Sequence, residues 1–116
     1  MRLIFIFIDG FGIGEKDKRK NPIRIAKVPN IDWMFKNYKV MHVDPSMGVK
    51  GLPQSATGQT TIFTGTNAPK LLGRHISGQP TETLKNIIRE KNLFTELIKK
   101  GYSVTNANVY RKEYLE

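Results

Sequence analysis

The sequence contains no cysteine, which excludes a disulfide scaffold, a thiolate metal site and a cysteine nucleophile. Acidic residues are also scarce, since 10 Asp and Glu stand against 19 Lys and Arg, a formal net charge of +9. The longest apolar run, residues 3–8, ends at Asp9 and is far shorter than the ~20 residues of a membrane span. We therefore expect a cytoplasmic protein with no membrane segment.

The 116 residues have ordinary globular proportions, with 39% hydrophobic and 25% charged side chains. This length suits one domain and excludes a two-domain enzyme. The positive charge favours anionic partners, and six basic residues gather at Lys16, Lys18, Arg19, Lys20, Arg24 and Lys27. No aromatic side chain interleaves with them, so binding of nucleic acid is disfavoured.

Apolar and helical patterns alternate along the chain. Residues 2–8 predict a strand buried on both faces, and residues 39–44 and 102–108 predict two more strands. Apolar periodicity predicts helices over 29–37, 81–90 and 92–100, and a helix is also favoured over 58–64. The stretches 45–58 and 67–80 are rich in turn-forming residues and predict loops. The alternation predicts an α/β fold, a parallel sheet flanked by helices.

Asp9 directly follows the first predicted strand, at the edge where parallel sheets bind ligands. Its carboxylate has two interpretations, a turn that bonds its own backbone or a ligand for magnesium, manganese or zinc. The glycines at 10, 12 and 14 do not form the dinucleotide-binding fingerprint, because Glu15 stands where its last glycine is needed.

Ser55 lies between a Gly/Pro-rich loop and a predicted helix, within the stretch Gln54-Ser55-Ala56-Thr57-Gly58-Gln59. It can serve as an ordinary helix N-cap or as a nucleophile where helix N–H groups attract phosphate. Of the two histidines, His42 is interpreted as structural, and His75 is the better candidate for contacting a phosphate.

Asp9-Gly10 is followed later in the chain by the Ser55 segment. In these two motifs and their order, the chain resembles the N-terminal part of the alkaline phosphatase superfamily. The branch concerned holds cofactor-independent phosphoglycerate mutase and phosphopentomutase. The resemblance implies an alkaline-phosphatase-like core and a divalent metal, manganese, zinc or magnesium. Asp9 would bind this metal, and Ser55 would bind it and form a phosphoserine, with Thr57 as the rival nucleophile. Gly58, Gln59 and His75 would contact the substrate, a phosphate ester.

The chain also departs from the family pattern. The remaining metal ligands of that branch, an Asp-His pair and an Asp-x-x-x-His pattern, are absent, and Gln59 stands where the mutases often have histidine. We therefore expect residues 1–116 to be one α/β domain or an N-terminal fragment. Alone it would be inactive, and a second polypeptide or a C-terminal half would be its partner. The alternatives are a non-enzymatic phosphate-binding remnant and a basic nucleic-acid-binding domain.

Overall fold

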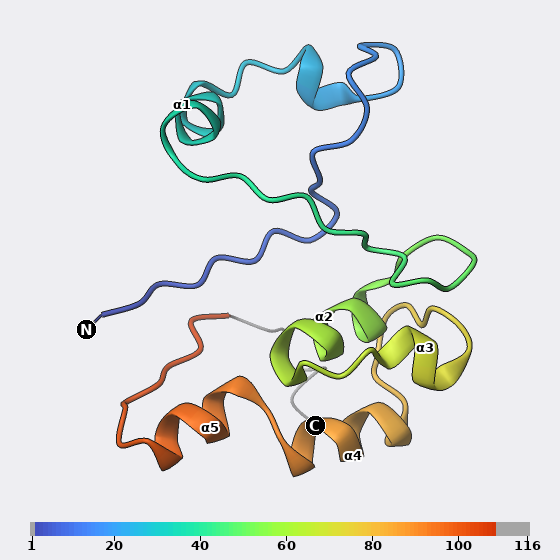
Figure 1. The fold of residues 1–116 in the computed structure, drawn as a ribbon, viewed down its shortest axis with the longest axis vertical. Coiled ribbons are helices and arrows are strands. Elements are labelled where there is room, and N and C mark those ends of the chain that lie inside the picture. Colours follow the sequence, from blue (N-terminus) through green and yellow to red (C-terminus); the bar gives the residue numbers. More distant parts are fainter. Residues whose placement is uncertain (1, 109–116) are drawn as a thin grey trace. The chain divides into compact units, whose positions relative to one another are not determined.

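The structure, a computed structural model, describes residues 2–108. It divides into two compact units, an N-terminal unit of residues 1–44 and a C-terminal unit of residues 45–116. The N-terminal unit contains the 3-10 helix η1 (Pro22–Arg24) and the helix α1 (Pro29–Asn37) (Figure 1). Pro29 is the first residue of α1, where its missing N–H costs no hydrogen bond.

Within residues 45–108, the described part of the C-terminal unit, the chain forms four helices. They are α2 (Ser55–Thr64), α3 (Ala68–Leu72), α4 (Glu82–Glu90) and α5 (Leu93–Lys99) (Figure 1). The central element is α2, which packs against α3, α4 and α5. The rings of Phe63 in α2 and Phe94 in α5 stack with their centroids 5.7 Å apart.

The core of the C-terminal unit lies between α2, α3 and α4. Leu84 and Ala68 are fully buried and Ala56 is nearly so, with Leu72, Ile76 and Ile87 packed around them. This core is small, and two buried threonines of α2 extend it, Thr57 and Thr60. Each buried hydroxyl therefore needs a hydrogen-bond partner.

Side-chain caps fix where the later helices begin. The Asn67 side chain accepts from the N–H of Lys70 at the start of α3, and the Thr81 hydroxyl accepts from that of Leu84 in α4. Asn92 and Thr95 form a reciprocal capping box at the start of α5. The helices predicted over 81–90 and 92–100 are confirmed, as is the helix over 29–37. The helix predicted from 58 begins earlier, at Ser55, and α3 lies in a stretch predicted as loop.

The predicted α/β fold is wrong, because residues 2–108 contain helices and no strand. The segments 2–8, 39–44 and 102–108 are not paired into a sheet. Leu3 to Ile8 were expected to be buried on both faces, yet Ile4 is 84% and Ile6 72% exposed. An apolar run predicts what a segment could bury, but a strand forms only when a neighbour pairs with its backbone groups.

No helix within residues 2–108 is long and apolar enough to cross a membrane. Several large apolar side chains of the N-terminal unit are exposed all the same, among them Ile4, Ile6, Trp33 and Val43.

Candidate functional site

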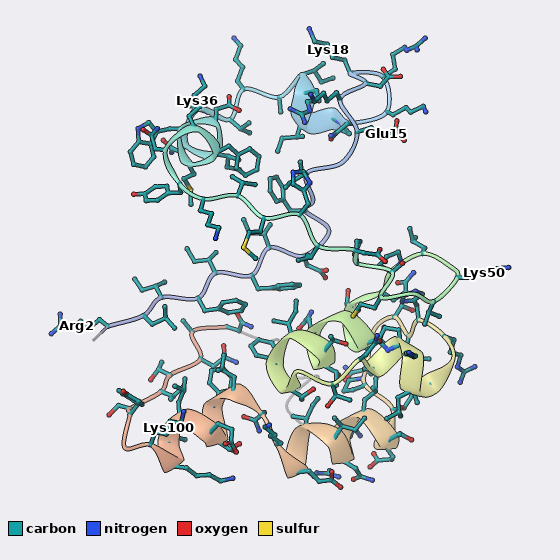
Figure 2. All side chains as sticks on the ribbon, viewed as in Figure 1. Arg2, Glu15, Lys18, Lys36, Lys50 and Lys100 are labelled. Carbon is teal, nitrogen blue, oxygen red and sulfur yellow. The ribbon has the colours of Figure 1, made fainter. Side chains whose placement is uncertain are left out.

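The loop before Ser55 is held by hydrogen bonds to the segments on either side of α3. The N–H of Val49 donates to the Ser46 carbonyl and closes a turn. The Asn67 amide donates to the Met47 carbonyl at 3.1 Å, and the His75 ring Nε2 donates to the Val49 carbonyl at 3.1 Å. Lys50 extends outward from this loop (Figure 2). The loop that leads into Ser55 is therefore held by Asn67, before α3, and by His75, after α3.

The start of α2 is capped by a backbone carbonyl rather than by a side chain. The Ile76 carbonyl accepts from the N–H of Ala56 at 3.1 Å and from that of Thr57 at 3.4 Å. The N–H of Gly58 donates to the Gln54 carbonyl at 2.9 Å, which is the first hydrogen bond of the helix itself. The N–H groups of Ala56 and Thr57 come before it and have no partner within the helix. Both are already bonded to the Ile76 carbonyl, so they are not available to an anion.

The threonines of α2 connect the helix to the loops around it. The hydroxyls of Thr60, Thr61 and Thr64 each donate to the carbonyl four residues earlier. The Thr61 oxygen also accepts from the N–H of Ala68 at 3.1 Å, and the Thr64 oxygen from that of Thr66 at 3.1 Å. These bonds satisfy the threonine hydroxyls on a helix of which Ala56, Thr57 and Thr60 are buried.

Thr57 makes the most extensive of these connections. Its hydroxyl donates to the Gln54 carbonyl at 3.3 Å and accepts from the N–H of Ile76 at 3.2 Å. The residue is fully buried. A hydroxyl in this setting offers no open approach to a phosphate ester, so the geometry disfavours Thr57 as a nucleophile.

Ser55 and Gln59 border a pocket of about 140 Å³ in the C-terminal unit. Its wall is completed by α4 and the segment before it, and its lining is formed by Ser55, Ala56, Gln59, Thr60, Phe63, Gly78, Pro80 and Ile88. Ser55, the first residue of α2, is half-buried at this pocket. The remaining walls are mostly apolar.

Gly58 and His75 are half-buried, as Ser55 is. A Cβ added at Gly58 would meet no atom within 4 Å, so a larger side chain at this position would not clash with its neighbours. The carbonyl bonded to His75 Nε2 can only accept, so the proton lies on Nε2. Within the described residues, the buried Nδ1 of this ring has no hydrogen-bond partner. The expected contacts of Gly58, Gln59 and His75 with substrate stay predictions.

Asp9 lies in the N-terminal unit, where its carboxylate accepts from the N–H of Gly10 at 3.0 Å. Asp9 and Gly10 form a turn in which the N–H of Phe11 donates to the Ile8 carbonyl at 3.4 Å. A turn in which Asp9 bonds to its own backbone was one interpretation of the sequence. Asp9 and Ser55 belong to different units, so their sharing of one cation stays a prediction. Residues 2–108 contain no group of three or more His, Asp or Glu side chains that could hold a metal ion.

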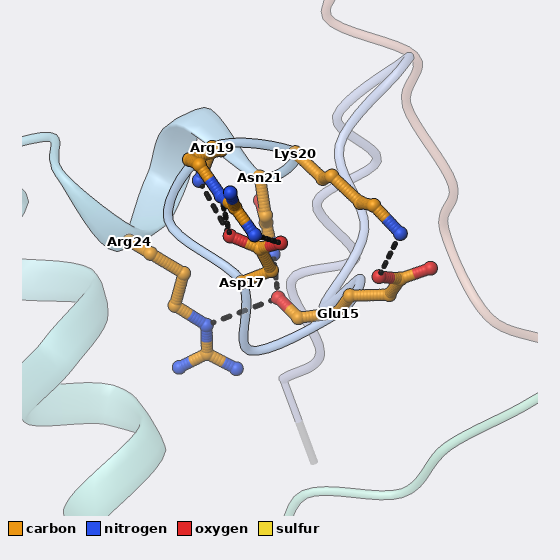
Figure 3. A network of polar contacts seen from close by, with 6 residues as sticks. All are labelled: Glu15, Asp17, Arg19, Lys20, Asn21 and Arg24. Atoms are coloured by element: carbon orange, nitrogen blue, oxygen red, sulfur yellow. Dashed lines mark hydrogen bonds and ion pairs between the residues drawn. The ribbon is translucent and has the colours of Figure 1, made fainter.

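The basic segment of the N-terminal unit pairs with its own acidic residues (Figure 3). Arg19 contacts Asp17 at 3.3 Å, and Lys20 contacts Glu15 at 3.3 Å. The backbone N–H and the guanidinium of Arg19 hold the pKa of the Asp17 carboxyl below its ordinary value. Exposed pairs of this kind add little stability. These ion pairs neutralise part of the positive charge of the segment, which weakens its attraction for an anionic partner.

The Asn21 side chain holds the same loop together through hydrogen bonds to its backbone. Its amide donates to the carbonyl of Glu15 at 2.7 Å (Figure 3). The same amide donates to the carbonyl of Ile13 at 2.8 Å. A Cβ at Gly14 would lie 2.7 Å from the Asn21 amide nitrogen, and the φ of Gly14 is +58°. Glycine is therefore required at position 14 for the packing of this loop.

Sequence reasoning missed the role of Ile76, because a backbone carbonyl that caps a helix 20 residues away leaves no residue pattern. It also missed the contributions of Phe63 and Ile88 to the pocket. A signal was present in α2, since Ser55, Gln59 and Phe63 recur every four residues and share one face of a helix.

Comparison with known proteins gave one partial similarity. A stretch of 60 residues is 32% identical to a 2,3-bisphosphoglycerate-independent phosphoglycerate mutase from Clostridium beijerinckii. The stretch covers 52% of this chain but only 12% of the length of that protein. No family model and no solved structure gave a match. The chain is thus distantly similar, over about half its length, to a phosphoglycerate mutase.

Proposed function

We propose that this chain supplies the phosphate-accepting serine, Ser55, of an enzyme that transfers or hydrolyses the phosphoryl group of a phosphate ester. The observation that carries the proposal is the place of Ser55, at the first residue of α2 and on the wall of a pocket. The partial similarity to a phosphoglycerate mutase supports the same class of reaction.

The proposed step forms a bond between the Ser55 oxygen and phosphorus while the bond from phosphorus to the ester oxygen breaks. The serine proton passes to a solvent base, and the released alcohol takes a proton from water. A water molecule then forms a bond to phosphorus, the phosphoserine bond breaks, and serine recovers its proton. A second alcohol in place of that water would give transfer instead of hydrolysis.

Two features favour Ser55 over the alternatives. The Thr57 hydroxyl is buried and bonded on both sides, so it is the weaker candidate for the same role. The alternative function is that of a non-enzymatic remnant that only binds phosphate. Such binding would depend on the N–H groups at the start of α2, and those of Ala56 and Thr57 are bonded to the Ile76 carbonyl. That alternative is therefore disfavoured.

The family resemblance adds a divalent metal that Asp9 and Ser55 would help to bind. Because two residues cannot complete such a site, we propose that the other ligands come from a second polypeptide or a C-terminal part of a longer protein. The chain alone is then expected to accept phosphate slowly and without sustained turnover.

Phosphate incorporation tests this proposal. The purified chain is incubated with p-nitrophenyl phosphate, with and without manganese, zinc or magnesium, and its intact mass is measured. We expect a mass increase of one phosphoryl group that disappears in Ser55→Ala and persists in Ser103→Ala, which removes an exposed serine. An equal increase in both variants, or none in the unmodified chain, would contradict the proposal. Steady release of p-nitrophenol would contradict the incomplete site.

A further inference from the structure

The peptide bond between Asp9 and Gly10 combines the two residue types that favour a spontaneous rearrangement of the backbone. Theirs is the one pair in the sequence in which Asp or Asn is followed directly by glycine. Because glycine has no Cβ, the backbone nitrogen after the aspartate is open to a close approach. Such a nitrogen can attack the side-chain carboxyl carbon of the preceding residue and close a small imide ring.

The structure places the reacting groups of this pair beside each other. The N–H of Gly10 donates to Oδ1 of Asp9 at 3.0 Å, so the carboxyl group lies next to the nitrogen that would attack it. Both residues are exposed, in the turn that the N–H of Phe11 closes on the Ile8 carbonyl. A Cβ built on Gly10 would meet no atom within 4 Å, so no neighbouring group shields that side of the bond. The pair is therefore open to water, with its carboxyl group in place.

The other aspartates are each kept from the same reaction. The Asp17 carboxylate accepts from the N–H of Arg19, two residues further on, and pairs with its guanidinium at 3.3 Å. Asp32 lies within α1, where the N–H of the next residue is directed toward a carbonyl one helical turn earlier. Asp44 is followed by proline, whose nitrogen has no hydrogen to lose. Asp9 is therefore the aspartate expected to react.

We infer that Asp9-Gly10 is a site of spontaneous isoaspartate formation. The Gly10 nitrogen forms a bond to the Asp9 carboxyl carbon, and one carboxyl oxygen leaves as water with the amide proton and a proton from solvent. Water then attacks the main-chain carbonyl carbon of Asp9, and the bond from that carbon to the Gly10 nitrogen breaks. The nitrogen stays bonded to the former side chain, so the backbone gains one carbon atom while mass and charge are unchanged.

Isomerisation at residue 9 requires nothing of the proposed function, but it changes a residue that the function uses. In isoaspartate the free carboxylate is attached to the Cα, and the backbone continues through the Cβ. The carboxylate of Asp9, which we propose as a metal ligand, is therefore displaced in any chain that has rearranged.

Incubation of the folded chain, followed by peptide analysis, tests for this rearrangement. The chain is held at physiological temperature and pH for several weeks, and isoaspartate is counted as methyl groups added by a protein isoaspartate methyltransferase. Electron-transfer fragmentation then locates it, in the tryptic peptide 3–16 for Asp9 and the chymotryptic peptide 12–33 for Asp17 and Asp32. We expect Asp9 to react at least about tenfold faster than either of the others. Equal rates at the three aspartates, or no isoaspartate at Asp9, would overturn the inference.

Substitutions on either side of the bond test its chemistry. Asp9→Glu keeps a carboxylate but lengthens the side chain beyond the favoured ring size, so the signal from peptide 3–16 should fall to background. Gly10→Ala places a methyl group beside the attacking nitrogen and should slow the reaction about tenfold. The matched control is Gly12→Ala, at a neighbouring glycine without a positive φ, which should react like the unmodified chain. A signal that survives Asp9→Glu, or an unchanged rate in Gly10→Ala, would contradict the assigned site.

Comparison with the unfolded chain tests the part played by the turn. The same incubation is carried out in guanidinium chloride, which removes the structure around Asp9 and Gly10 but keeps the sequence. We expect the folded chain to react at least as fast, because the turn already holds the carboxyl group beside the nitrogen. Slower reaction in the folded chain would show that the fold protects this bond, and would refute the inference.

Discussion

Thr57 and Ile76 are joined by two hydrogen bonds that run in opposite directions. The N–H of Ile76 donates to the Thr57 hydroxyl at 3.2 Å, and the N–H of Thr57 donates to the Ile76 carbonyl at 3.4 Å. The same carbonyl also accepts from Ala56. This pair ties the segment after α3 to the first turn of α2, next to Ser55. The position of the candidate nucleophile therefore depends on a buried threonine that does not itself react.

Thr57→Val should destabilise the C-terminal unit by about 1–3 kcal/mol, because it removes a buried hydroxyl that accepts from the part-buried N–H of Ile76 while nearly preserving shape. Urea unfolding followed by far-ultraviolet circular dichroism measures the change. Thr83→Val, at an exposed position of α4, is the matched control and should stay within about 0.5 kcal/mol of the unmodified chain. Equal stability of the two variants would show that the Thr57–Ile76 pair is unimportant.

Leu84→Ala should cost about 2–5 kcal/mol, because Leu84 is fully buried at the centre of a small core. That is a large fraction of the stability of a typical domain. At the upper end of this range the variant should be unfolded at room temperature, which would be seen as loss of the helical signal. Leu71→Ala removes the same atoms from a side chain that is 57% exposed, and its midpoint in urea should move little. A larger effect at Leu71 than at Leu84 would refute the assigned core.

Glu82 gives α4 a small dependence of stability on pH. Its contact with Lys85 at 2.6 Å, with a smaller effect of Arg89, holds the pKa of the Glu82 carboxyl below its ordinary value of 4.5. A carboxyl whose folded pKa is lowered stabilises the fold above its unfolded value, and this contribution disappears as pH falls through the folded value. Glu82→Gln should therefore flatten the acid limb of the thermal melting profile.

The control for this prediction is Glu90→Gln, which removes a carboxylate from the opposite end of the same helix. Melting temperatures of the three proteins are compared from neutral pH to below 4.5. The effect at Glu82 should also shrink in high salt, since the pair is exposed. A profile for Glu82→Gln that matches the unmodified chain throughout would show that the contact with Lys85 does not stabilise the fold.

The helices were largely predictable because their signals are local. Leu84, Ile87 and Ile88 recur with helical spacing, and Asn92 is a strong N-cap residue, so α4 and α5 could be predicted within a residue or two. The short helix α3 also carried a cue, since Asn67 precedes it and Pro69 lies in its first turn. The surrounding glycines obscured that cue.

The lack of strand pairing in residues 2–108 and the cap of α2 could not be predicted from the sequence, for one shared reason. Residues 3–8 have the composition of a buried strand, but whether they pair depends on a neighbour that the segment itself does not specify. The Ile76 carbonyl caps α2 through its backbone, which any residue could provide. Local patterns report what a segment prefers, whereas these features depend on contacts between distant segments.

The position of the phosphate on the chain tests the central claim most directly. After incubation with p-nitrophenyl phosphate, the chain is digested and the peptide that contains residues 51–70 is fragmented in a mass spectrometer. Our account predicts that the phosphoryl group is on Ser55, because Ser55 is half-buried at the pocket wall while Thr57 is fully buried. Phosphate on Thr57, or spread over the exposed serines and threonines of the chain, would contradict it.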